Sequence, residues 1–235
     1  MGISLSLIGE LVNHDTKAVS HFLFLSNDLC PFGEIKRPIN FKYSFKKIEA
    51  PYETYIGTHF SVRYYIRVSI TRKMFNTVKN YEKDFYIENI AKEPLIVGNC
   101  RMEIGVSEKL HMEYELFQNK LHLNDVITGK LYFISVSSNI KSIEVQLIKK
   151  EKIGSGDSMT YENFIMGRTE ACDGQPYKGD VIPFRMYLTG RGLTPSIKRA
   201  EGFGVNYYVK ILVILENDKL LYKNQEVILW RKTFG

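Results

Sequence analysis

The chain has 235 residues, of which 44% are hydrophobic and 25% charged, and these shares are typical of a globular protein rather than a disordered one. The net charge of +6 comes from scattered Lys and Arg, with Lys149, Lys150 and Lys152 as the densest group, so we do not expect nucleic acid or anionic lipid as the main ligand. No signal peptide and no apolar run near the roughly 18 residues that span a bilayer are present, so we expect a cytoplasmic protein whose membrane contact is indirect.

Strand-type alternation runs through the sequence, whereas helical periodicity is rare. Ile3–Leu7 alternates apolar residues with serine, and Val62–Ile70 places Val, Tyr and Ile on one face opposite a more polar face. The remaining predicted strands, in chain order, are Leu110–Leu116, Val126–Val136, Ile143–Ile148, Ile182–Leu188, Val205–Leu215 and Leu220–Trp230. The aromatic share of 13% also favours pleated sheets.

Turn-forming residues separate the predicted strands. Glu216–Lys219 predicts a hairpin turn between two strongly patterned strands, and Gly154–Ser158 predicts a loop. Many strands with no helix long enough to cross over between them predict an all-β fold of antiparallel sandwiches. A Pro and a Gly bracket a short apolar run near residue 98, so we expect an N-terminal sandwich over residues 1–98 and a C-terminal sandwich over residues 99–235.

No pattern in the sequence predicts catalysis or a bound cofactor. The three cysteines, Cys30, Cys100 and Cys172, have neither the number nor the spacing of a disulfide framework or a zinc site. Glu113 and Glu115 share a strand face, as a carboxylate dyad would, but solvated strand carboxylates are far commoner than glycosidase dyads. We therefore expect a non-enzymatic protein without a metal or cofactor.

Several segments resemble a single family of arrestin-like proteins. Pro51–Gly57, followed by Val62–Val68, resembles the arrestin-fold pattern in which a turn leads into a long strand. Met102–Tyr114, His122–Phe133 and Gln225–Lys232 resemble segments of the vacuolar protein sorting twenty-six family, and the last two together are the most specific. The resemblance spans essentially the whole chain.

The resemblance implies an arrestin-like fold of two antiparallel β-sandwiches end to end. Family members usually carry further residues before the segment that matches Gly2–Gly9, so the N-terminal sandwich is expected to lack its first strands. Such a sandwich would show an unpaired sheet edge and exposed apolar surface.

The resemblance also implies a function: the small scaffold and cargo-adaptor subunit of the retromer coat, in endosome-to-Golgi transport and endosomal recycling. Its implied partners are a helical-solenoid subunit of the vacuolar protein sorting thirty-five type, a lipid-binding sorting nexin and the cytosolic tails of membrane cargo. The implied location is cytoplasmic, peripheral to the endosome membrane.

One implied binding surface contacts the solenoid subunit. In the family a loop in the C-terminal sandwich makes this contact through two bulky apolar residues, which are the smaller Ala171 and Cys172 here. Asp173, Gly174 and Tyr177 complete the candidate surface, and we expect either weaker binding or compensation by the ring of Tyr177.

A second implied surface takes a cargo peptide that adds as an extended strand in a groove completed by the sorting nexin. The pocket positions match Ile104 and Tyr222, which are far apart in sequence. The alternative is that both are ordinary core residues.

Two other functions are compatible with the sequence. One is a different arrestin-like adaptor, for instance of the retriever type, and the other is a hydrolase or carbohydrate-binding β-sandwich. Recovery of a solenoid subunit from lysate would distinguish a retromer subunit from the first alternative. A glycan array or hydrolase screen would test the second alternative.

Overall fold

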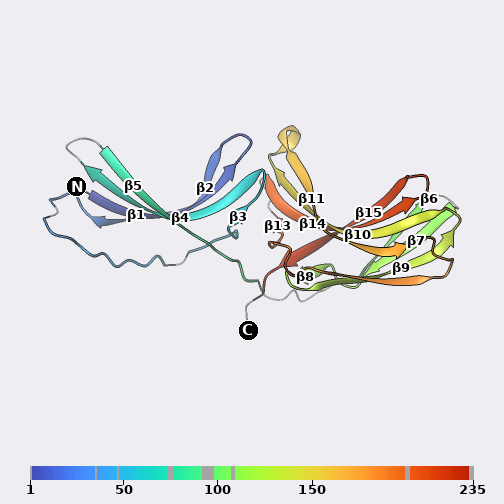
Figure 1. The fold of residues 1–235 in the computed structure, drawn as a ribbon. Helices are drawn as coiled ribbons and strands as arrows, with labels where there is room; N and C mark the ends of the chain where they lie inside the picture. The colour runs from blue at the N-terminus through green and yellow to red at the C-terminus, as the bar shows by residue number, and fades with distance from the viewer. Residues whose placement is uncertain are drawn as a thin grey trace. The chain divides into compact units, whose positions relative to one another are not determined.

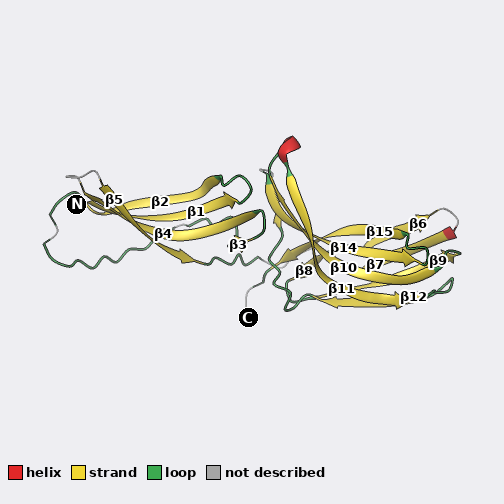
Figure 2. Ribbon diagram, turned by 45° about the horizontal axis from the view of Figure 1, so that its top comes forward, coloured by secondary structure: helices red, strands yellow, loops and turns green. Residues whose placement is uncertain are grey.

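Strands make up nearly all of the regular structure in the computed structural model (Figures 1 and 2), which confirms the all-β prediction. The structure describes residues 2–34, 36–46, 48–72, 77–91, 98–106, 109–198 and 202–232. Within this part, no helix is long and apolar enough to cross a membrane.

The chain divides into two compact units, Met1–Asn89 and Ile90–Gly235. This division comes earlier than the domain boundary expected after residue 98. Residues 92–97, which form most of the expected seam, lie outside the described residues.

The N-terminal unit contains a five-stranded antiparallel sheet. Its strands are β1 (Gly2–Asn13), β2 (Val19–Cys30), β3 (Tyr55–Ile56), β4 (Phe60–Arg72) and β5 (Thr77–Phe85). β1 pairs with β2 on one side and β4 on the other, and β4 also pairs with β3 and β5. The described strands of this unit make one sheet.

Alternation in β1 and β4 gives this sheet an apolar face. Leu7, Val62 and Tyr64 are at most 2% exposed. Gly9 lies opposite Tyr64, and a Cβ at this glycine would approach the Tyr64 ring to 2.9 Å and the ring of Phe22 to 2.7 Å. The missing side chain of Gly9 therefore makes room for the two rings.

The opposite face of the sheet carries a charged cluster. The guanidinium of Arg63 donates hydrogen bonds to Glu10 (3.3 Å), Glu82 (3.1 Å) and Asp84 (2.7 Å), while the Tyr65 hydroxyl donates to Glu10 (3.0 Å). Burial disfavours the charge of Arg63, but its bonds to the three carboxylates outweigh burial and raise its pKa above the ordinary value. Burial and the bond to Glu10 raise the pKa of Tyr65 to about 12.

The C-terminal unit is a sandwich of two sheets. Its strands are β6 (Cys100–Val106), β7 (Leu110–Leu116), β8 (Lys120–His122), β9 (Val126–Val136), β10 (Ile140–Ile153), β11 (Thr160–Asp173), β12 (Val181–Tyr187), β13 (Ile197–Lys198), β14 (Phe203–Leu215) and β15 (Leu220–Trp230). One sheet has the order β11-β10-β14-β15-β8, with β13 beside β14, and the other has the order β12-β9-β7-β6. All pairs are antiparallel except β15 with β8.

The core of this unit lies between the two sheets. Every second residue of β7 is fully buried, which is the period of a strand with one covered face. The facing sheet contributes apolar side chains with the same period from β14, namely Tyr207, Val209, Ile211 and Val213.

The structure confirms the predicted strands and the predicted hairpin turn. Each predicted strand coincides with a strand here or forms part of a longer one, except that β12 ends at Tyr187, one residue before the predicted end at Leu188. In the turn between β14 and β15, the amide of Asp218 donates to the carbonyl of Leu215 at 2.9 Å, and Asp218 has a left-handed φ of 59°. Three long strands, β2, β5 and β11, were not predicted.

Candidate partner-binding surfaces

The loop that follows β11 is anchored to the sandwich at both ends. The amide of Gly174 donates to the carbonyl of Lys141 (2.8 Å), and the amide of Gly179 donates to the carbonyl of Phe133 (2.7 Å). Between them, the amide of Tyr177 donates to a carboxylate oxygen of Asp180 (2.8 Å). These bonds hold the backbone of the loop around Tyr177, whose ring is 78% exposed.

Ala171 and Cys172 lie at the end of β11, an edge strand of the larger sheet. Cys172 pairs with Ile143 and Glu170 pairs with Glu144, so Ala171 between them has no partner on β10. This extra residue forms a β-bulge, which bends the edge and interrupts regular pairing. Both Ala171 and Cys172 are partly exposed. The structure thus brings the five candidate residues of this surface together in one short, ordered segment.

The thiol of Cys172 is not activated. Burial raises its pKa, and the nearby carboxylates of Asp173, Asp180 and Glu170 raise it further. A protonated thiol is a weak nucleophile, so Cys172 is better suited to packing against a partner than to covalent catalysis.

Ile104 and Tyr222 lie in different environments. Ile104 is 5% exposed on β6, an edge strand of the smaller sheet. Tyr222 is 59% exposed on β15, where the Lys210 ammonium lies 4.6 Å from its ring centroid. Tyr222 lines a shallow depression with side chains of the larger sheet, among them Ile165, and Ile104 is not part of that lining.

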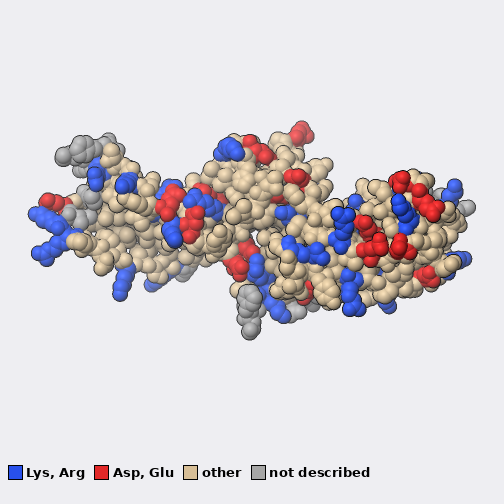
Figure 3. Space-filling view, in the orientation of Figure 1, with Lys and Arg blue, Asp and Glu red and all other residues tan. Residues whose placement is uncertain are grey.

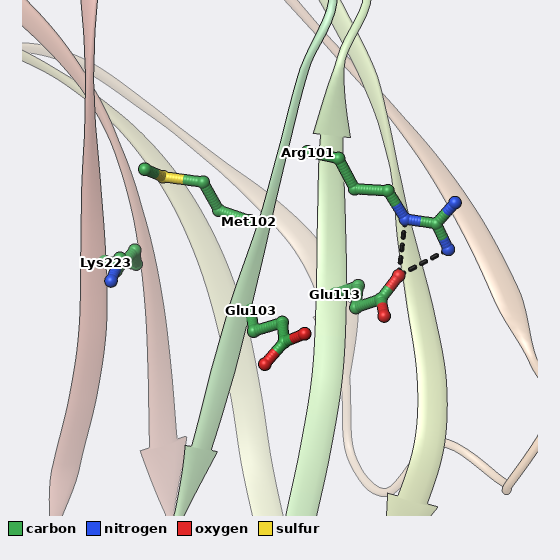
Figure 4. A pocket seen from close by; sticks show the side chains of 5 residues that line it. All are labelled: Arg101, Met102, Glu103, Glu113 and Lys223. Atoms are coloured by element: carbon green, nitrogen blue, oxygen red, sulfur yellow. Dashed lines mark hydrogen bonds and ion pairs between the residues drawn. The ribbon is translucent and has the colours of Figure 1, made fainter.

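A second depression lies between β6 and β15, next to both residues. It is lined by the chain neighbours of Ile104 and Tyr222, with Met102 and Glu103 on β6 and Lys223 on β15 (Figure 4). The two strands are linked by a hydrogen bond from the Cys100 thiol to the side-chain carbonyl of Gln225 (3.0 Å), although they belong to different sheets. Among the described strands β6 pairs only with β7, which leaves its other edge without a strand partner there. The sequence did not point to it, because the lining comes from segments far apart in the chain.

The carboxylates of β7 do not favour acid catalysis. Hydrogen bonds from Tyr132 and Asn99 lower the pKa of Glu115, and Glu113 is ion-paired with Arg101. A glycosidase needs one carboxylic acid with a raised pKa. The Glu113–Glu115 pair therefore does not support the hydrolase alternative.

Among the described residues, one group has the composition of a metal site. Glu103, His111 and Glu113 have ligand atoms within 4.8 Å of one another, because Glu103 pairs with Glu113 across β6 and β7. Glu113 already contacts Arg101, and groups of exposed carboxylates commonly occur without a metal. We assign no metal here.

Comparison with known proteins gives consistent matches along the chain. A family model described as vacuolar protein sorting-associated protein 26 matches residues 1–218. A relative of that name from Plasmodium falciparum (isolate 3D7) is 37% identical over 236 residues, which cover 100% of this chain and 79% of the relative. Vacuolar protein sorting-associated protein 26B from Homo sapiens is 36% identical over 233 residues, which cover 98% of this chain and 69% of the relative.

Proposed function

The chain belongs to the vacuolar protein sorting-associated protein 26 family, and from that premise we propose that it is a scaffold and cargo-adaptor subunit of the retromer coat. In this role it has no catalytic step of its own. It binds a helical-solenoid subunit and a sorting nexin on the cytosolic face of endosomes, and it holds the cytosolic tails of membrane cargo for transport to the Golgi or back to the cell surface.

The ordered segment at the end of β11 is the observation that carries the proposal. A bulged edge, an exposed tyrosine ring and two small, partly buried side chains form a surface that a partner can cover. A large exposed aromatic ring on a loop whose backbone is hydrogen-bonded makes a good interface anchor, so Tyr177 is suited to be the main contact with the solenoid subunit.

Pull-down of the tagged full chain from lysate, followed by mass spectrometry, tests the proposal as a whole. Recovery of the retromer solenoid subunit supports it. Recovery of a retriever-type solenoid instead would replace it with the related adaptor function, and recovery of neither would contradict both.

Replacing Ala171 with Asp and Cys172 with Asn is expected to weaken binding of the solenoid subunit at least tenfold, which corresponds to about 1.4 kcal/mol. The new polar groups would lose water in the interface without gaining partners. Isothermal titration calorimetry measures the affinity. Met159→Asp with Thr160→Asn, at the other end of β11, is the matched control and should bind like the parent. Unchanged affinity of the Ala171/Cys172 variant would place the interface elsewhere.

Ile104→Ser and Tyr222→Ala are expected to have different effects, because a core residue contributes to stability and a binding residue contributes to affinity. Because Ile104 is buried, its replacement should lower the melting temperature, whereas the exposed Tyr222 can be trimmed without loss of stability. Loss of the Tyr222 ring should cost about 1–3 kcal/mol of cargo-peptide binding, measured with the sorting nexin present.

Tyr161→Ala is the control for Tyr222→Ala. Tyr161 is also an exposed tyrosine with a lysine ammonium, that of Lys150, over its ring at 4.1 Å. If Tyr222→Ala binds cargo peptide as well as Tyr161→Ala does, Tyr222 has no part in the cargo groove.

A further inference from the structure

The shallow depression that ends at Tyr222 lies on the outer face of the larger sheet of the C-terminal unit. Its lining includes Ile148 on β10 and Tyr208 on β14, whereas their chain neighbours Leu147 and Val209 are fully buried in the core. β10 and β14 each pair with a strand on both sides, so the depression does not depend on an open sheet edge. Its volume of about 500 Å³ lies within the range of about 300–1,000 Å³ that is usual for ligand sites.

The charge of the depression comes from two lysines. Of the described residues that line it, only Lys150 and Lys210 are charged, and neither forms an ion pair with another described residue. The Lys150 ammonium lies 4.1 Å from the ring centroid of Tyr161, and the Lys210 ammonium lies 4.6 Å from that of Tyr222. An aromatic ring attracts a cation without neutralising its charge, so both ammoniums are available to an anion.

The carboxylates beside the depression already have partners. The side-chain amide of Asn206 donates to Glu226 (2.9 Å), which also pairs with Lys198 (3.2 Å). The side-chain amide of Gln146 donates to Glu144 (2.7 Å). Elsewhere on the C-terminal unit, basic and acidic side chains are interspersed over the face seen in Figure 3. The depression is therefore a positive site suited to an anionic ligand.

The two lysines are spaced like alternate residues of an extended chain. Lys150 and Gln146 are four residues apart on β10, and Lys210 is the register partner of Gln146 on β14. The two lysine side chains thus leave the sheet about 13 Å apart along the strand direction. Ile148 and its partner Tyr208 lie midway between them. In an extended peptide, the first, third and fifth side chains share one face and have this same spacing.

A side-chain amide lies beside each lysine. Asn163 on β11 is the register partner of Lys150, and Asn224 on β15 is the partner of Lys210. Both amides line the depression. An amide can donate and accept hydrogen bonds, which matches the donor and acceptor that each residue of a peptide main chain carries. This lining favours a peptide over a simple anion.

We propose that this depression binds an extended peptide of another protein that has acidic, apolar and acidic residues at alternate positions. The two carboxylates contact Lys150 and Lys210, and the apolar side chain between them covers Ile148 and Tyr208. The proposal goes beyond the retromer function, because this site needs neither the solenoid subunit nor the sorting nexin, although Tyr222 lies at one end of it.

An anionic membrane surface fits the depression less well. Recognition of anionic lipid typically uses about four to eight clustered basic residues, because each one near the surface contributes only about 1 kcal/mol. Here two lysines are separated by an apolar row that lies at the bottom of a depression. A flat bilayer would leave that row uncovered, whereas a single protruding side chain can reach it.

The test uses the full chain alone and short synthetic peptides with blocked ends. The first peptide has the core Glu-Ser-Leu-Ser-Glu, and the second has the same residues in the order Glu-Glu-Leu-Ser-Ser. In the third, lysine replaces both glutamates of the first. Titration of the ¹⁵N-labelled chain followed by NMR measures the affinity and locates the affected amides. We expect the first peptide to bind and to shift amides around Ile148 and Tyr208, the second to bind at least about fivefold more weakly, and the third not to bind.

The double variant Lys150→Glu with Lys210→Glu should reverse the charge preference. We expect it to bind the first peptide at least about tenfold more weakly than the parent does and to bind the lysine peptide instead, which would also show that its surface is folded. Lys130→Glu with Lys219→Glu is the matched control on the same unit. Lys130 also has an aromatic ring near its ammonium, that of Phe117 at 5.8 Å, but it lies on the smaller sheet. The control should bind the first peptide like the parent.

Several results would overturn the proposal. Equal binding of the first two peptides would mean that charge is recognised without spacing. Shifts confined to strands other than β10, β11, β14 and β15 would place the peptide elsewhere, and the absence of binding by all three peptides would remove the peptide site. Binding of phosphatidylserine vesicles that is lost in the Lys150/Lys210 variant, without peptide binding, would identify a membrane contact instead.

Discussion

A valine in place of Gly129 is expected to unfold the C-terminal sandwich. Gly129 lies in the middle of β9, between Leu116 on β7 and Phe184 on β12. A Cβ at this position would lie 2.2 Å from the carbonyl oxygen of Glu115 and 2.5 Å from the ring of Phe184. The ring can turn aside, but the carbonyl belongs to β7 and moves only if strand pairing breaks. We expect a loss of more than about 4 kcal/mol, a large part of the stability of an ordinary domain.

Urea unfolding followed by circular dichroism measures this effect, and two further variants identify its cause. Gly33→Val is the control, because a Cβ there meets only the carbonyl oxygen of Pro31, at 3.9 Å. It should change stability by no more than about 0.5 kcal/mol. Adding Phe184→Leu to Gly129→Val should not restore stability, since the clash with the Glu115 carbonyl is unchanged. A Gly129→Val protein that unfolds at the parent's urea concentration would contradict the steric argument.

The sequence predicted interior strands much better than edge strands. β7 is covered on one face along its whole length, so its apolar residues recur at every second position. β2, β5 and β11, which were not predicted, are edge strands that pair on one side only. Most of their side chains are exposed or partly exposed, so burial imposes no alternation on their sequences. Their existence depends on the neighbour that pairs with them.

The sequence nominated the candidate residues but did not predict their environment. The resemblance placed Ala171 and Cys172 in one loop, but the bulge at Ala171 follows from the register between β10 and β11, which no local pattern encodes. Likewise, Ile104 and Tyr222 both occur in strands, and only the packing of two sheets decides that the first is buried and the second exposed.

Replacing Arg63 with Met is expected to destabilise the N-terminal unit by about 3 kcal/mol, because it leaves a buried carboxylate without its cation. The side chain of Glu10 is only 9% exposed, and its interactions are with Arg63, the Tyr65 hydroxyl and the imidazole of His21 at 3.5 Å. Arg63, on β4, also donates a hydrogen bond to Asp84 on β5. Its removal therefore breaks the ionic link between β1, β4 and β5. Met keeps the unbranched apolar stem of the Arg side chain, so the main loss is the guanidinium with its charge and its hydrogen bonds.

Thermal and urea unfolding of the single and double variants test whether the charge of Glu10 is the cause. Glu10→Gln combined with Arg63→Met should be more stable than Arg63→Met alone, since a neutral amide oxygen still accepts the Tyr65 hydrogen bond without an unpaired charge. Lys198→Met is the control, because it removes the cation from an exposed pair with Glu226 at 3.2 Å and should cost less than about 1 kcal/mol. If Arg63→Met costs no more than Lys198→Met, the cluster on this face is an ordinary solvated surface and Glu10 does not need Arg63 to remain buried.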